Sequence, residues 1–156
     1  MKIRICAVGR LKAGPEKDLV DDYLARFDRS GRNLGLGPVT VFEVEDRKAG
    51  GKAGEAAQLL RAVPDTALLC CMDERGKQLS SRAFAAQLAE WRDAGRSELA
   101  LVIGGADGLD PSIRTRADLS LSLGNMVWPH MLVRAMLAEQ LYRSATILAG
   151  APYHRD

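Results

Sequence analysis

Two short, almost wholly apolar runs constrain the fold more than any other feature of this chain. They cover residues 66–72 and 99–103, and neither shows the alternation of apolar and polar residues that marks a strand with one solvent-facing side. A continuously apolar strand is typical of a parallel sheet that is covered by helices on both faces. The two runs therefore predict the centre of such a sheet.

The remaining segments extend this pattern into an alternation of strands and helices. Further strands are predicted at Lys2–Val8, Val39–Val44 and residues 119–123. Five helices are predicted. The first begins at Pro15, the second covers residues 55–63, and the third follows Ser80 or Ser81 and ends near Gly95. The fourth begins after Asp110 with Pro111, and the last begins at about Leu132. The order predicts an α/β fold with a mostly parallel sheet and helices on both faces. We expect one domain, residues 1–156.

Composition excludes several classes of protein. No apolar run approaches the roughly 20 residues of a membrane span, and the N-terminus lacks the features of a signal peptide, so we expect a cytoplasmic protein. Cys6, Cys70 and Cys71 lie in apolar runs without metal-ligand spacing, which predicts reduced core thiols and no metal site. The net charge of +2 is too small to indicate a nucleic-acid partner by itself. Segments 30–38 and 46–54, both rich in glycine, are predicted to be mobile surface loops.

Two loops follow neighbouring strands and should meet at one edge of the sheet. Residues 104–108 follow a buried strand and contain three glycines, which suits either a binding loop or a tight structural turn. Residues 124–129 follow the fifth strand. Ligands bind beyond the carboxyl ends of parallel strands, so the two loops predict a pocket suited to an adenine ring. Its apolar lining is expected to include Met72, Leu123, Met126, Val127 and Trp128.

The last helix and the tail carry the most unusual side chains. The helix should place Val133, Met136, Leu137 and Leu141 on one face, and Arg134, Glu139 and Arg143 on the opposite face. Glu139 and Arg143 are four residues apart, so they form either a surface ion pair or part of a site beside the tail. Three consecutive residues near the C-terminus are Tyr153, His154 and Arg155, whereas terminal residues are usually small and polar. This cluster suggests recognition or chemistry.

A series of short motifs runs from one end of the chain to the other: Ala7-Val8-Gly9, Leu11-Lys12, Ile103-Gly104-Gly105, Gly108-Leu109, Leu121-Ser122, Pro129-His130, Arg134, residues 139–143 and residues 152–155. Together they closely resemble the ribosomal RNA large-subunit methyltransferase H family of the SPOUT class. The last helix and the tail are the most specific parts of this resemblance. It implies a homodimer with a C-terminal trefoil knot, which general rules of chain topology would not predict.

The resemblance also implies an activity and a site. Members of the family methylate N3 of a pseudouridine in 23S rRNA of assembled ribosomes, with S-adenosylmethionine as the methyl donor. The implied donor site comprises Met72, Gly104, Gly105, Leu123, Gly124, Asn125, Met126, Val127 and Trp128. The implied acceptor site comprises His130 and Arg134 as substrate-binding residues and Glu139, Arg143, Tyr153, His154 and Arg155 as catalytic residues. The tail is expected to complete the partner subunit's site.

Methyl transfer from a sulfonium depends mainly on positioning and on exclusion of water. The N3 proton of the acceptor must leave, and Arg155, Arg143 or His154 would assist its departure. Two other classes remain as alternatives. One is a nucleotide-binding α/β enzyme that uses His130 and His154 on a small metabolite, and the other is a ribosome-binding factor without turnover.

Overall fold

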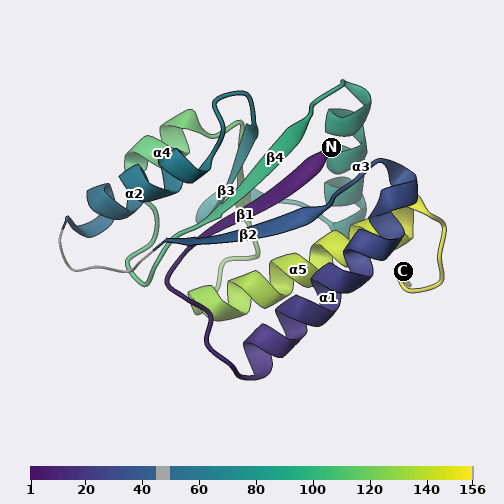
Figure 1. The fold of residues 1–156 in the computed structure, drawn as a ribbon, viewed down its shortest axis with the longest axis horizontal. Helices are drawn as coiled ribbons and strands as arrows, with labels where there is room; N and C mark the ends of the chain where they lie inside the picture. Colours follow the sequence, from purple (N-terminus) through teal and green to yellow (C-terminus); the bar gives the residue numbers. More distant parts are fainter. Residues whose placement is uncertain (45–49, 156) are drawn as a thin grey trace.

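The computed structural model describes residues 1–44 and 50–155, which form one five-stranded sheet between two layers of helices (Figure 1). Neighbouring strands are parallel, in the order β2-β1-β4-β3-β5. The strands are β1 (Lys2–Val8), β2 (Val39–Val44), β3 (Leu68–Gln78), β4 (Glu98–Ile103) and β5 (Leu119–Ser122). The helices are α1 (Pro15–Gly31), α2 (Gly51–Ala62), α3 (Ser81–Asp93), α4 (Pro111–Arg116) and α5 (His130–Leu148), with a 3₁₀ turn, η1 (Arg32–Leu34). The predicted α/β fold with helices on both faces is confirmed.

The strands direct their side chains alternately into two apolar cores. On β1, Ile3 and Ile5 pack under α1, α3 and α5, whereas Cys6 and Val8 pack under α2 and α4. The first core receives buried helix residues Phe27, Phe84, Leu88, Leu137 and Leu141. The second receives Ala56, Leu59 and Ile113. Because both faces of the sheet are covered, the central strands β3 and β4 need apolar residues at successive positions.

The helix ends follow their predicted caps. The Ser80 hydroxyl accepts a hydrogen bond from the Ala83 N–H at 3.1 Å and so begins α3. The Asp110 carboxylate accepts one from the Ser112 N–H at 2.9 Å and so begins α4. Each cap satisfies a backbone donor that the first helical turn leaves without a partner. After α3, Gly95 adopts the left-handed conformation, with φ of 76°, that ends many helices.

Both glycine-rich segments contain more regular structure than predicted. In segment 30–38, α1 continues to Gly31, η1 follows, and Leu36 is buried in the first core. The Leu36 N–H donates to the Gly31 carbonyl at 2.9 Å, so burial of one leucine anchors the segment. In segment 46–54, residues 46–49 lie outside the described residues, and α2 begins at Gly51 rather than at residue 55. Of the described residues in these segments, 30–34 and 51–54 are helical, so the prediction of loops is wrong there, whereas 35–38 form no helix or strand. That the segments are mobile stays a prediction.

Strand β3 continues six residues beyond its predicted end at Met72. Met72 and Lys77 both pair with Leu121 of β5, so the residues between them bulge out of the ladder. Gly76 lies on this bulge, and a Cβ there would be 2.6 Å from the backbone of Ser120. The bulge therefore packs against the β5 backbone at a distance that only a glycine permits. Smaller differences are that β5 ends at Ser122 rather than residue 123, and α5 begins at His130 rather than near Leu132.

Candidate functional site

The carboxyl ends of β3, β4 and β5 border one cavity of about 300 Å³. Its lining contains all residues of the predicted donor site except Asn125, namely Met72, Gly104, Gly105, Leu123, Gly124, Met126, Val127 and Trp128. His130, at the start of α5, lines the same cavity. The prediction that the two loops form one pocket at this edge of the sheet is confirmed.

The loop after β4 is a tight turn and also a wall of this cavity. Gly105 and Gly108 form an antiparallel bridge, and Gly108 has a positive φ of 77°. A Cβ on Gly104 would lie 2.8 Å from the Gly108 backbone, so the two sides of the loop touch. The two alternatives for this loop, a binding loop and a structural turn, are thus compatible. Its glycines leave backbone groups without a covering side chain at the cavity wall.

The loop after β5 is held by two polar contacts. The Ser122 hydroxyl accepts a hydrogen bond from the Gly124 N–H at 3.2 Å and donates one to the Gly124 carbonyl at 2.9 Å. The Asn125 side-chain oxygen accepts a hydrogen bond from Gln78 on the β3 extension at 2.5 Å. Asn125 therefore fixes the loop from outside the cavity. Gln78 was not predicted, since its role depends on an extension of β3 that has no apolar pattern.

Charged residues that were not predicted also line the cavity. The Asp73 carboxylate accepts hydrogen bonds from Arg114 Nη1 at 3.0 Å and from the Arg75 N–H at 2.9 Å. Burial opposes ionisation, but these hydrogen bonds hold the pKa of the Asp73 carboxyl below its ordinary value. Asp73 directly follows Met72, the last apolar residue of the predicted strand. This position, at the carboxyl end of a predicted central strand, is the feature of the sequence that could have identified Asp73 as a site residue.

Arg134 is buried, with 2% of its surface exposed, so its predicted place on the polar face of the last helix is wrong. Its guanidinium donates to the Glu43 carboxylate at 2.9 Å and to the carbonyls of Val8 and Gly9 at 2.5 and 2.6 Å. Burial lowers the pKa of Arg134, and Glu43 opposes this effect. These contacts hold the first turns of α5 against the ends of β1 and β2. His130 lies beside the same turn, with Nε2 3.9 Å from where a Gly9 Cβ would be.

Glu139 is the centre of a second cluster, which includes the C-terminal tail. Its carboxylate accepts hydrogen bonds from Arg143 Nε at 2.9 Å, from Gln140 at 2.8 Å and from the Tyr153 hydroxyl at 3.1 Å. Arg143 in turn contacts His154, with 3.2 Å between Nη1 and Nδ1. Glu139 and Arg143 therefore form the predicted ion pair, and this pair lies beside the tail.

Aromatic rings pack around this cluster. The Tyr153 ring lies 4.7 Å from the Tyr142 ring, which lies 6.2 Å from the ring of Tyr23 on α1. The Arg143 guanidinium lies 4.9 Å from the centre of the Tyr153 ring. Burial raises the pKa of Tyr153, and hydrogen bonds with Tyr23 and Glu139 raise it further. The tail is thus fastened to the outer side of α1 and α5 by charge, hydrogen bonds and stacking.

The predicted acceptor residues fall into two groups within one chain. His130 and Arg134 lie on the first turns of α5, and Glu139 and Arg143 lie further along it with the tail. At a rise of about 1.5 Å per residue, the helix places His130 and Arg143 roughly 20 Å apart. In Figure 1 the C-terminal tail lies at the end of α5 opposite to the end that begins with His130. One chain therefore does not bring the donor loops and the tail together.

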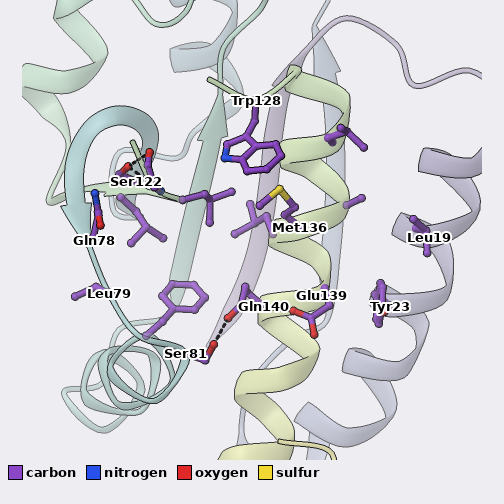
Figure 2. A pocket seen from close by; sticks show the side chains of 17 residues that line it. Leu19, Tyr23, Gln78, Leu79, Ser81, Ser122, Trp128, Met136, Glu139 and Gln140 are labelled. Atoms are coloured by element: carbon purple, nitrogen blue, oxygen red, sulfur yellow. Dashed lines mark hydrogen bonds between the residues drawn. The ribbon is translucent and has the colours of Figure 1, made fainter. Parts of the chain in front are cut away.

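A groove of about 700 Å³ runs along α5 toward this cluster (Figure 2). Trp128 lies at one end of it and Glu139 toward the other, with Leu19 and Tyr23 of α1 on one side. Its lining is largely apolar, and Leu19, Trp128 and Leu132 are exposed there. The groove shares a wall with the first cavity, formed by Leu121, Leu123, Gly124 and Trp128.

The three cysteines are free and buried, as predicted. Burial raises the pKa of Cys6 to about 11 and also raises the pKa of Cys70 and Cys71, so none of the three is a ready thiolate at neutral pH. Within residues 1–44 and 50–155, no group of three or more His, Cys, Asp or Glu side chains is arranged to hold a metal ion. No helix in this part of the chain has the length and apolar character to cross a membrane.

Comparison with known proteins identifies the class to which this fold and site belong. Residues 1–154 match the family described as "Predicted SPOUT methyltransferase", and the chain therefore belongs to the SPOUT methyltransferase family. The chain is similar over its whole length to curated relatives called "Ribosomal RNA large subunit methyltransferase H". Identity is 70% with the relative from Roseobacter denitrificans, covering 100% of both chains, and 68% with that from Ruegeria pomeroyi, covering 99% of both. The relative from Dinoroseobacter shibae is 67% identical, again covering 99% of both chains.

A solved structure supports the fold independently. It is described as "The structure of a probable methylase family protein from Haemophilus influenzae Rd KW20". It superposes with a TM-score of 0.55, covering 99% of this chain and 70% of the other, at 14% sequence identity. At that identity the likeness concerns the fold alone.

Proposed function

We propose that this protein is an S-adenosylmethionine-dependent methyltransferase that acts on large-subunit ribosomal RNA. The supporting observation is the cavity at the ends of β3, β4 and β5, because its lining is the set of loops that the family resemblance assigns to the donor. Full-length relatives that carry the name of this activity support the choice of RNA. Action on the ribosome would place the protein in the cytoplasm.

The residues of the cavity fit this donor. Its volume of about 300 Å³ is in the range of small-ligand sites, and Leu123, Val127 and Trp128 offer an apolar wall to an adenine ring. Gly104 and Gly105 leave backbone groups open for hydrogen bonds. S-adenosylmethionine would supply an electrophilic methyl group, and the cavity walls would orient it and exclude water.

The acceptor in this proposal is N3 of a pseudouridine in 23S rRNA, in assembled ribosomes. The Glu139 carboxylate already accepts hydrogen bonds from Arg143 and Tyr153, so the role of these three residues is to position the tail. His154 and Arg155 would then act at the base, by accepting the N3 proton or by stabilising the resulting anion. His130, beside the donor cavity, would contact the same nucleotide. Arg134 would hold His130 in place through its buried contacts.

The separation of the two clusters supports a homodimer. Reacting atoms must approach to about 3–3.5 Å, whereas the tail of one chain lies roughly 20 Å along α5 from its own donor loops. If the tail holds the acceptor base, the methyl group has to come from the donor cavity of a second subunit. The exposed apolar groove along α5 is the surface that such a subunit would cover.

The proposal also includes the C-terminal trefoil knot that the resemblance implies. The close approach of Gly76 to the backbone of Ser120 and Leu121 supports tight packing of the β3 extension against β5, as a knotted chain would need. A knotted arrangement would keep the β3 extension and the loop after β5 in contact while the donor binds and leaves.

The direct test is transfer of labelled methyl groups to ribosomes that lack the modification, followed by mass mapping of the RNA. We expect one new methyl group, on a pseudouridine of 23S rRNA. Association with ribosomes without transfer would favour a non-catalytic factor. Binding of a nicotinamide nucleotide without binding of S-adenosylmethionine would favour an enzyme of small metabolites.

A further inference from the structure

The lining of the donor cavity combines apolar and charged residues. The apolar residues include Ile103, Leu109, Leu121, Leu123, Val127 and Trp128. The charged residues are Lys52, Asp73, Glu74, Arg75, Asp107 and Arg114. An adenine ring accounts for the apolar residues and leaves the charged residues without an assigned role.

Asp73 differs from the carboxylate next to it because it is inside the structure. Its side chain is 7% exposed, whereas that of Glu74 is 53% exposed. Arg114 and the Arg75 N–H each occupy one of its two oxygens, so its carboxylate is fixed in one orientation. A carboxylate offers about four acceptor positions, and two hydrogen bonds leave the others available to a ligand. Asp73 is thus a fixed and ionised group at the wall of the cavity.

The proposed reaction poses a specific problem of recognition. S-adenosylmethionine and its by-product, S-adenosylhomocysteine, differ by one methyl group and one positive charge, while their adenosine and amino-acid parts are the same. Burial of one methyl group accounts for only about a fourfold preference. A larger preference requires a group that responds to the sulfonium charge, and a fixed carboxylate in a partly desolvated site does so.

We propose that Asp73 makes this cavity prefer the cationic sulfonium donor over the neutral thioether by-product. The inference rests on the proposed function, because it presumes that S-adenosylmethionine is the donor. Arg114 holds the carboxylate in place and offsets part of its charge. A cavity with this preference would release the by-product readily and remain available to new donor.

The test is calorimetric titration of the full-length protein with each of the two compounds. The quantity of interest is the ratio of the dissociation constant for S-adenosylhomocysteine to that for S-adenosylmethionine. We expect Asp73→Asn to lower this ratio about tenfold, mainly by weakening the binding of S-adenosylmethionine. Asp93→Asn is the matched control, since it also removes a carboxylate paired with an arginine but lies outside the cavity lining, and it should leave the ratio as in the wild type.

The variant Arg114→Gln distinguishes a role of Asp73 in recognising the ligand from a role in maintaining the structure. It breaks the same ion pair as Asp73→Asn but keeps the carboxylate, so the ratio should stay at the wild-type value or rise. An unchanged ratio in Asp73→Asn, or an equal fall in all three variants, would overturn the inference. If Asp73→Asn does not fold, the double variant D73N/R114Q keeps a neutral hydrogen-bonded pair and must also lose the preference. Failure of the wild type to bind either compound would instead contradict the proposed donor.

Discussion

The Tyr153 hydroxyl donates a hydrogen bond to the Glu139 carboxylate at 3.1 Å, which joins the C-terminal tail to a residue of α5 fourteen positions earlier. The same carboxylate holds Arg143, which reaches His154. Four side chains, two on α5 and two on the tail, thus form one support for the last residues of the chain. This support is why a terminal segment can have a defined position.

Glu139→Gln should uncouple the tail from α5. The amide is neutral and can no longer hold Arg143 by charge, so the tail should lose its fixed position. We expect methyl transfer to ribosomes to fall at least about tenfold, while donor affinity in calorimetry stays within about twofold. Glu90→Gln on α3 is the control, since Glu90 contacts Gln87 on an exposed face. Full transfer by the Glu139 variant would contradict the role of this cluster.

Tyr153 should make the stability of the tail sensitive to alkaline pH. The pKa of Tyr153 is raised above the ordinary tyrosine value of about 10, so the neutral phenol stabilises the folded state. That stabilisation is fully present below pH of about 10 and is lost as pH rises through the raised pKa. The ultraviolet absorbance of ionising tyrosines would be titrated in the wild type and in Tyr153→Phe. The difference between the two curves, which reports Tyr153, should have its midpoint above pH of about 10. A midpoint at or below the ordinary value would remove the basis of this prediction.

Glu43→Ala should destabilise the whole domain. It removes the carboxylate that compensates the buried Arg134 guanidinium, and an uncompensated buried charge costs about 3–5 kcal/mol of unfolding free energy. Denaturant unfolding measures this loss. Asp22→Ala breaks the exposed ion pair with Arg26 and should cost less than about 1 kcal/mol. Similar losses in the two variants would show that the buried pair contributes no more than a surface pair.

Gly76→Ala should be costly for a steric reason. Its Cβ would lie 2.6 Å from the Ser120 backbone, and backbone cannot move aside as a flexible side chain can. We expect a loss of about 3 kcal/mol or more in unfolding free energy. Gly95→Ala provides the comparison: Gly95 has a positive φ of 76° but has open space around it, so it should cost only about 1–2 kcal/mol. A Gly76 variant as stable as the wild type would exclude so close an approach of the two backbones at this bulge.

Mixed dimers test whether the tail acts on the partner's donor cavity. One subunit would lack residues 153–156, and the other would carry Gly105→Phe, after calorimetry shows that this change abolishes donor binding. Each homodimer should be inactive, whereas random mixing should restore about one quarter of wild-type activity, because half the dimers contain one complete site. No recovery would show that donor cavity and tail act within a single subunit.

The sheet and the cavity could be predicted because each depends on local sequence. The apolar runs at 66–72 and 99–103 can only be buried strands, and parallel strands present the loops after them at one edge. Met72, Gly104 and Trp128 therefore line the predicted cavity. The caps at Ser80 and Asp110 depend on neighbours two or three residues away, so they could also be predicted from the sequence.

The parts that escaped prediction depend on distant partners. The polar residues after Met72 extend β3 only because β5 pairs with them. Arg134 is buried only because Glu43, 91 residues earlier, supplies a carboxylate. Helical periodicity alone assigns an arginine to the solvent face. The tail was identified as unusual, but its separation from the donor loops depends on the length and direction of α5.

Trp128 and its neighbours on the wall between the donor cavity and the groove offer a route to inhibition. A compound that fills the groove would compete with the second subunit proposed to cover it, and would contact the residues shared with the donor cavity without entering that cavity. Such a compound need not imitate S-adenosylmethionine, a molecule that many unrelated enzymes bind. Selectivity would then come from the apolar lining of the groove rather than from the donor cavity.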